Sequence, residues 1–194
     1  MLKIMVLLLI SITHFCFAEV NREGGLMIPE VVYKHRKDFL ANLSVTMPNN
    51  EASFKKLVKL ADDGNSDANW MLAVIYHHKN RHTALAAERY KISIARKDSH
   101  YTDSMINLAA INVSNGDYNS GVKLYLEAGI NGDYMGYQEL GTLYLLGKGV
   151  EQDFIKSKEY YLKAEKIGCI QCKAVLNQWD KIVEMKKKDG PLRE

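Results

Sequence analysis

Cys169 and Cys172 form the most chemically loaded motif of this chain, a C-x-x-C pair. At the start of a helix, a separation of three residues places both thiols on one face of the first turn, where a disulfide can close. In an exported protein an even pair of cysteines is normally oxidised. We therefore favour a structural disulfide over two packed, reduced thiols. A redox pair would require an attackable thiol of low pKa, and no thioredoxin-type βαβ pattern surrounds the motif.

Three histidines, His77, His78 and His82, could in principle ligate a metal, with His100 nearby in sequence. No cysteine or carboxylate completes a recognisable ligand signature around them. Polar residues at the end of a helix and in the following turn are the simpler interpretation. The sequence thus predicts no metal site and no cofactor.

Motifs of catalysis are missing from the sequence. It contains no G-x-S-x-G, Walker loop or H-E-x-x-H pattern, and we find no convincing constellation of paired carboxylates. The Gly147-Lys148-Gly149 turn is not a phosphate loop, because no strand precedes it and its continuation is acidic. We therefore predict a protein that is not an enzyme and has no catalytic residues.

The helices predicted to carry the cysteines and histidines belong to a pattern that repeats along the chain. Small or glycine residues recur in one helical register that begins at residues 64, 100, 132 and 168, in steps of 36, 32 and 36 residues. A second register matches residues 153–168 to residues 117–132, with weaker copies at 82–93 and 54–61. A helical hairpin that cannot bury its apolar face alone must stack on copies of itself. The two registers together predict stacked hairpins over residues 54–178.

The best copy spans residues 132–168, with Leu140, Gly141 and Tyr144 before the glycine turn and Tyr161 after it. This stretch resembles the Sel-one-like repeat (SLR), a relative of the tetratricopeptide repeat. The resemblance implies an all-α fold, a short right-handed α-solenoid of about four stacked helical hairpins. The shorter turns at residues 77–81 and 114–116 depart from the family pattern and are closer to tetratricopeptide turns.

The two ends of the chain indicate that the protein is exported and that a helix caps the solenoid. Residues 1–18 combine an early Lys3, an apolar run and small residues before Glu19, a pattern typical of a secretory signal peptide cleaved after Ala18. The apolar run is too short for a comfortable membrane span. We divide the chain into this signal peptide, an N-terminal extension with a capping helix (19–50, the helix opening at Pro29 and ending at Leu43), the repeat solenoid (51–178) and a C-terminal helix end with a basic tail (179–194).

The net charge argues against a nucleic-acid partner, and the predicted localisation indicates where the partner is met. Loss of Lys3 with the signal peptide takes the formal net charge from +3 to +2, and nucleic-acid binders usually concentrate far more positive charge on one face. We predict a periplasmic protein, with secretion as the alternative. The expected partner is a protein, and the expected oligomeric state is a monomer or a weak dimer.

By similarity to tetratricopeptide units, the first helix of each hairpin lines the binding groove. Carried onto this chain residue by residue, the resemblance implies that the groove is lined by Asp67, Trp70, Val74, His77, Asp103, Ile106, Met135, Gln138, Thr142, Leu145, Gln171 and Gln178. Such a mixture of one tryptophan, apolar groups and short polar groups suits protein recognition.

The resemblance leaves three functions open. Small exported SLR proteins occur beside secreted phospholipase effectors, which implies an immunity protein that binds and neutralises a toxic effector in the periplasm. The second is an envelope adaptor or a secreted virulence factor. A disulfide-handling protein that uses Cys169 and Cys172 is the third. We favour the first on family analogy rather than on any one residue.

Overall fold

The structure is a computed structural model that describes residues 19–20, 26–27, 42–78 and 82–189. Four predicted features lie wholly or partly outside these residues: the signal peptide (1–18), residues 29–41 of the capping helix, residues 79–81 of the first turn and the end of the basic tail. Leu43, the predicted end of the capping helix, lies in a bend.

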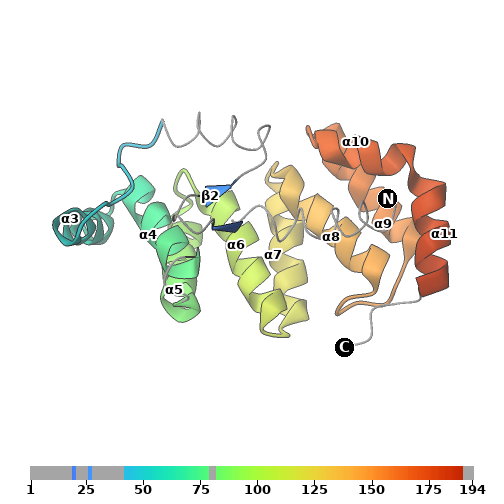
Figure 1. Cartoon of the computed structure of the whole chain (residues 1–194), viewed down its shortest axis with the longest axis horizontal. Coiled ribbons are helices and arrows are strands. Elements are labelled where there is room, and N and C mark those ends of the chain that lie inside the picture. Colours follow the sequence, from blue (N-terminus) through green and yellow to red (C-terminus); the bar gives the residue numbers. More distant parts are fainter. Residues whose placement is uncertain (1–18, 21–25, 28–41, 79–81, 190–194) are drawn as a thin grey trace. The chain divides into compact units, whose positions relative to one another are not determined.

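Within the described part the protein is built from helices, as predicted (Figure 1). Two strands of two residues each, β1 (Glu19–Val20) and β2 (Leu26–Met27), pair antiparallel before the first helix. The helices are α3 (Glu51–Asp62), α4 (Ser66–His78), α5 (Thr83–Arg96), α6 (Tyr101–Ser114), α7 (Tyr118–Ile130), α8 (Tyr134–Leu146), α9 (Phe154–Lys166), α10 (Ile170–Asn177) and α11 (Trp179–Asp189).

The helices are organised as hairpins. The register that begins at residues 64, 100, 132 and 168 falls on α4, α6, α8 and α10, which are the first helices of the hairpins α4/α5, α6/α7, α8/α9 and α10/α11. The second register falls on α5, α7 and α9, and α3 precedes the first hairpin. The described chain is thus an all-α solenoid of helical hairpins, as the sequence predicts.

Small residues mark the places where two helices cross closely. The first-helix register contributes Ala68, Ser104 and Cys172, each no more than 1% exposed, together with Gly136. A Cβ atom on Gly136 would lie 2.2 Å from the backbone oxygen of Tyr125, so only glycine permits this contact between α7 and α8. These residues recur because a larger side chain would push the helix backbones apart.

The turns that precede the first helices of the hairpins contain a glycine with a positive φ, with one exception. Gly64, Gly132 and Gly168 each adopt a positive φ, between 93° and 109°, which lets the chain reverse between helices. In the turn before α6, however, the left-handed residue is Lys97, with φ 49°, and His100 instead precedes the helix as its N-cap. His100 therefore does not adopt the conformation of the three glycines that it was predicted to match. The residues that follow it in the same register do lie on α6, as predicted.

The chain divides into two compact units, Met1–Arg89 and Tyr90–Glu194, with the boundary inside α5. In the first unit the core joins Leu57 and Ala61 of α3 to Met71, Leu72 and Ile75 of α4. In the second unit a larger core runs through α6, α7 and α8. Its buried residues are Met105, Ile106, Ala109, Val113, Tyr125, Ala128, Leu140 and Leu143.

The last hairpin differs from the sequence prediction. We expected Trp179, Ile182 and Val183 to continue the preceding helix, but α10 ends at Asn177 and α11 begins at Trp179. Figure 1 shows the chain turning sharply between the two helices. This turn makes α11 the second helix of a hairpin whose first helix has only 8 residues.

Candidate functional site

The twelve predicted groove residues fall into three groups by exposure. Two, Gln171 and Gln178, are exposed. Four are between 7% and 9% exposed and offer little surface to a partner, namely Trp70, Val74, Ile106 and Leu145. The six half-buried residues are Asp67, His77, Asp103, Met135, Gln138 and Thr142. We call the side of α6, α8 and α10 that bears the predicted residues of the second unit the first-helix face.

Two carboxylates of the second unit lie close enough to repel each other. Asp103 stands in the first turn of α6, and Asp133 is the N-cap of α8, where its side chain accepts a hydrogen bond from the backbone N–H of Met135. Burial and the nearby Asp133 raise the pKa of Asp103 to about 6, although His100 partly opposes the shift. Burial also raises the pKa of Asp133. The sequence pattern does not reveal this pair, because the two residues come from different repeats.

A third carboxylate, Glu139, lies on α8 near the tyrosines Tyr125 and Tyr161. Burial raises its pKa to about 7, and Lys148 only partly opposes the shift. Its charge in turn raises the pKa of both tyrosines, which burial has already raised more strongly. Among the described residues, neither Glu139 nor Asp103 forms an ion pair. The second unit therefore holds desolvated carboxyl groups that form no direct ion pair within the described part of the chain.

A set of side-chain contacts links the first-helix face to the C-x-x-C pair. Thr142 donates from Oγ1 to the backbone oxygen of Gln138, and its Oγ1 lies 2.9 Å from the hydroxyl of Tyr161. Oε1 of Gln138 lies 3.2 Å from Sγ of Cys169. These contacts fix Gln138 and Thr142, two predicted groove residues, against α9 and α10.

Cys169 and Cys172 are joined by a disulfide in the structure, with their Cα atoms 5.3 Å apart. Cys169 is the N-cap of α10, and its Sγ accepts a hydrogen bond from the backbone N–H of Cys172. Both side chains are 1% exposed. Because a redox-active sulfur must be open to attack, this burial favours a structural bond over a catalytic one.

The three histidines form no metal site in the described structure. The rings of His77 and His78 stack at 4.1 Å, while the ring of His82 contacts Tyr76 edge-on. Burial lowers the pKa of His77. Within residues 42–78 and 82–189 no group of three or more histidine, cysteine or acidic side chains is placed to hold a metal ion.

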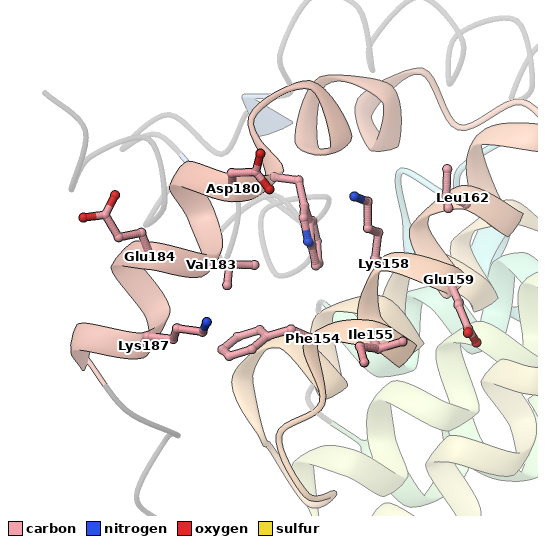
Figure 2. Close-up of a pocket in the computed structure, with 10 residues that line it drawn as sticks. Phe154, Ile155, Lys158, Glu159, Leu162, Asp180, Val183, Glu184 and Lys187 are labelled. Atoms are coloured by element: carbon pink, nitrogen blue, oxygen red, sulfur yellow. The ribbon is translucent and has the colours of Figure 1, made fainter.

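A second surface, which the sequence analysis missed, is a groove of about 610 Å³ between α9 and α11 (Figure 2). We call it the α9/α11 groove. Its apolar side chains are Phe154, Ile155 and Leu162 from α9 and Trp179 and Val183 from α11. Ile155 and Leu162 are 75% and 47% exposed. Their spacing of seven residues, outside the core register of α9, is a signal that the sequence did contain.

No helix in the described part of the chain is long and apolar enough to cross a membrane.

Comparison with known proteins establishes the fold. No family model and no curated protein matches this sequence. The solved structures that are similar to it include two proteins with SLR repeats. One is described as a protective antigen present in uropathogenic Escherichia coli strains with an SLR fold: its TM-score is 0.56 and its identity 21%, over 77% of this chain and 33% of that chain. The other is a Sel1 repeat protein from Oxalobacter formigenes: its TM-score is 0.57 and its identity 19%, over 76% of this chain and 62% of that chain.

This chain therefore has the SLR fold that its sequence predicts. It spans about a third of the length of the first structure and about three fifths of the second.

Proposed function

We propose that this protein is a non-enzymatic binding module that captures one protein partner on its first-helix face. The observation that carries the proposal is the pair of desolvated carboxylates, Asp103 and Glu139, on α6 and α8. The SLR fold of the chain agrees with this role, because stacked repeats present an extended binding surface.

The chemistry of these carboxylates indicates what the partner presents. A carboxylate that loses water without gaining a cation destabilises the folded state, and a raised pKa is the signature of that loss. A lysine or arginine of a partner would form the missing ion pair and remove the penalty. Arginine fits best, because its planar guanidinium binds carboxylates in a bidentate manner. We therefore expect a cationic loop or helix as the bound segment.

The finer proposal is that the protein acts in the periplasm as an immunity protein. A short array of irregular hairpins suits one dedicated partner, and a toxic effector of phospholipase type is the class that we favour. Binding would be largely rigid and would block the effector without a covalent step. Burial of the C-x-x-C pair favours this interpretation over a disulfide-handling one.

An envelope adaptor or secreted virulence factor is the second candidate. It is favoured by the similarity to a structure described as a protective antigen of uropathogenic E. coli, since a protective antigen must be accessible to antibodies. An adaptor would bind several partners, whereas an immunity protein binds one.

Capture with three baits tests the proposal. The baits are the full chain, the double variant Asp103→Asn/Glu139→Gln, and the control Glu88→Gln/Glu127→Gln, which removes the same charge from exposed positions on α5 and α7. We expect one stoichiometric partner from the envelope or secreted fraction, retained by the control and lost by the first double variant. Inhibition of that partner's hydrolase activity would establish the immunity role. Equal capture by all three baits would overturn the binding surface.

A further inference from the structure

The α9/α11 groove is a built apolar surface that the proposed function does not use. Large apolar side chains are rarely left exposed in a cluster, and Ile155, Leu162, Ile167 and Ile170 are all exposed on α9, α10 and the turn between them. Figure 2 shows α9 side chains on one side of the groove and α11 side chains on the other. The groove is lined with Phe154, Val183 and Trp179, and Trp179 is 7% exposed.

The charges that border the groove are balanced. Lys158 and Glu159 come from α9, and Asp180 and Lys187 come from α11. Among the described residues, none of these four forms an ion pair, whereas the fifth charged lining residue, Glu184, pairs with Lys188 at 2.8 Å. Two cations and two anions without partners, around one apolar groove, form a pattern that complements itself.

The same surface also carries both a protruding side chain and a recess. Ile155 is 75% exposed beside the groove, so a second copy of the chain related by a two-fold axis would present its own Ile155 to the recess. A two-fold interface uses the same patch on both subunits, so its charges must be self-complementary.

We propose that the α9/α11 groove is the interface of a two-fold homodimer. In this dimer Ile155 of each copy fills the groove of the other, and Lys158 and Lys187 pair with Glu159 and Asp180 across the two-fold axis. The lining of this interface contains neither Asp103 nor Glu139, so dimerisation and partner capture are separable by mutation.

The test uses two isoleucines that differ in position but not in exposure. Ile155 and Ile170 are 75% and 76% exposed, and Ile170 does not line the groove. Sedimentation equilibrium is measured on the protein expressed from the full sequence and purified from cells, and on its variants Ile155→Glu and Ile170→Glu. We expect a dimer whose dissociation constant rises at least about 100-fold in Ile155→Glu and stays within about threefold in Ile170→Glu.

A charge-exchange pair provides a second, independent readout. The variant Lys158→Glu/Lys187→Glu and the variant Glu159→Lys/Asp180→Lys should each fail to self-associate but should form a dimer when mixed. A chain that stays monomeric up to roughly 1 mM would overturn the proposal. So would equal weakening by Ile155→Glu and Ile170→Glu, or a mixture of the charge variants that remains monomeric.

Discussion

The hairpins α8/α9 and α10/α11 occupy equivalent places in the repeat, but only the first has closely packed helices. At the crossing of α8 and α9 stand Gly141 and Ser157, and the hydroxyl of Ser157 donates to the backbone oxygen of Gly141 at 2.6 Å. The equivalent residues of α10 and α11 are Asn177, which is exposed, and Ile182. Ser157 and Ile182 are equivalent because each is the fourth residue of its helix and donates its backbone N–H to the residue that precedes the helix, Asp153 and Gln178 respectively.

Two side chains decide whether a hairpin of this solenoid closes tightly. In α4/α5 and α6/α7 the same positions are filled by Ala73 with Ala86 and by Ala109 with Gly121, so the first three hairpins share a small pair. The bulkier pair in the last hairpin keeps α11 away from such a close crossing, and the α9/α11 groove lies beside it. The edge-on contact of Trp179 with Tyr161, at 6.0 Å, links α11 to α9 instead.

The largest expected effect is from Gly141→Val. A Cβ atom at Gly141 would already lie 3.0 Å from the ring of Tyr161, and valine adds two further methyl groups at this tight contact. We expect a loss of about 3 kcal/mol in the free energy of unfolding, measured with urea. The matched variant Asn177→Val, at the exposed equivalent position, should change the stability by less than about 0.5 kcal/mol. Similar losses in both would show that the two crossings do not differ.

A second difference between these hairpins is the pH dependence of stability. Glu139 of α8 is equivalent to Val175 of α10, so only the close hairpin contains a desolvated carboxyl group. The folded-state pKa of Glu139, about 7, lies above its ordinary value of 4.5. The folded protein therefore holds its proton longer than the unfolded chain, and stability falls as the pH rises from about 4.5 to about 7.

Glu139→Gln removes the contribution of Glu139 to this dependence. At pH 8 we expect the variant to be more stable than the native chain by about 2 to 3 kcal/mol, whereas at pH 4 the two should be alike. Urea unfolding at the two pH values measures the difference. Glu127→Gln, on the exposed side of α7, is the control and should not change the pH profile. A gain of the same size at pH 4 would contradict the assignment to ionisation.

The disulfide distinguishes the hairpins in a third way, because it closes the first turn of α10 and no cysteine lies in α8 or α9. By the chain-entropy model, a crosslink across so short a loop contributes about 2 kcal/mol. Reduction, or the variant Cys169→Ser/Cys172→Ser, should therefore lower the hydrogen-exchange protection of α10 and α11 by that amount. Protection of α8 and α9 should stay the same. Two reactive thiols at positions 169 and 172 of the untreated, denatured chain would show that the bond is absent.

Much of this architecture was predictable from the sequence. The spacing of the small residues predicted the helices from α4 to α9, because a close crossing tolerates no large side chain wherever it recurs, but it did not predict the break between α10 and α11. The register failed at the turn before α6, where Lys97 adopts the conformation that glycine adopts in the other three. The physical reason is that a non-glycine residue rarely adopts a positive φ, so nothing in the sequence pattern identifies Lys97 as the turn residue.

The candidate site was less predictable than the fold. The sequence indicated Asp103 as a groove residue but not its neighbour Asp133, because their proximity depends on how one repeat stacks on the next. The groove assignments of Trp70 and Val74 rest on a tetratricopeptide analogy that says little about how deeply each side chain is buried. The α9 side of the α9/α11 groove could be predicted, since Ile155 and Leu162 lie outside the core register. The α11 side could not, because its position depends on the turn at Gln178, which the sequence pattern does not indicate.

The smallest effect tests the hydrogen bond at the crossing of α8 and α9. Ser157→Ala keeps the small volume there and removes only the donor to Gly141, so we expect a loss of about 1 kcal/mol in the free energy of unfolding. Ser114→Ala is the matched control, because Ser114 also donates to a backbone oxygen, that of Ile111, at an exposed position where water replaces the lost bond. It should cost less than about 0.3 kcal/mol. If the two losses were equal, the small volume of Ser157 rather than its hydroxyl would account for the close packing of this hairpin.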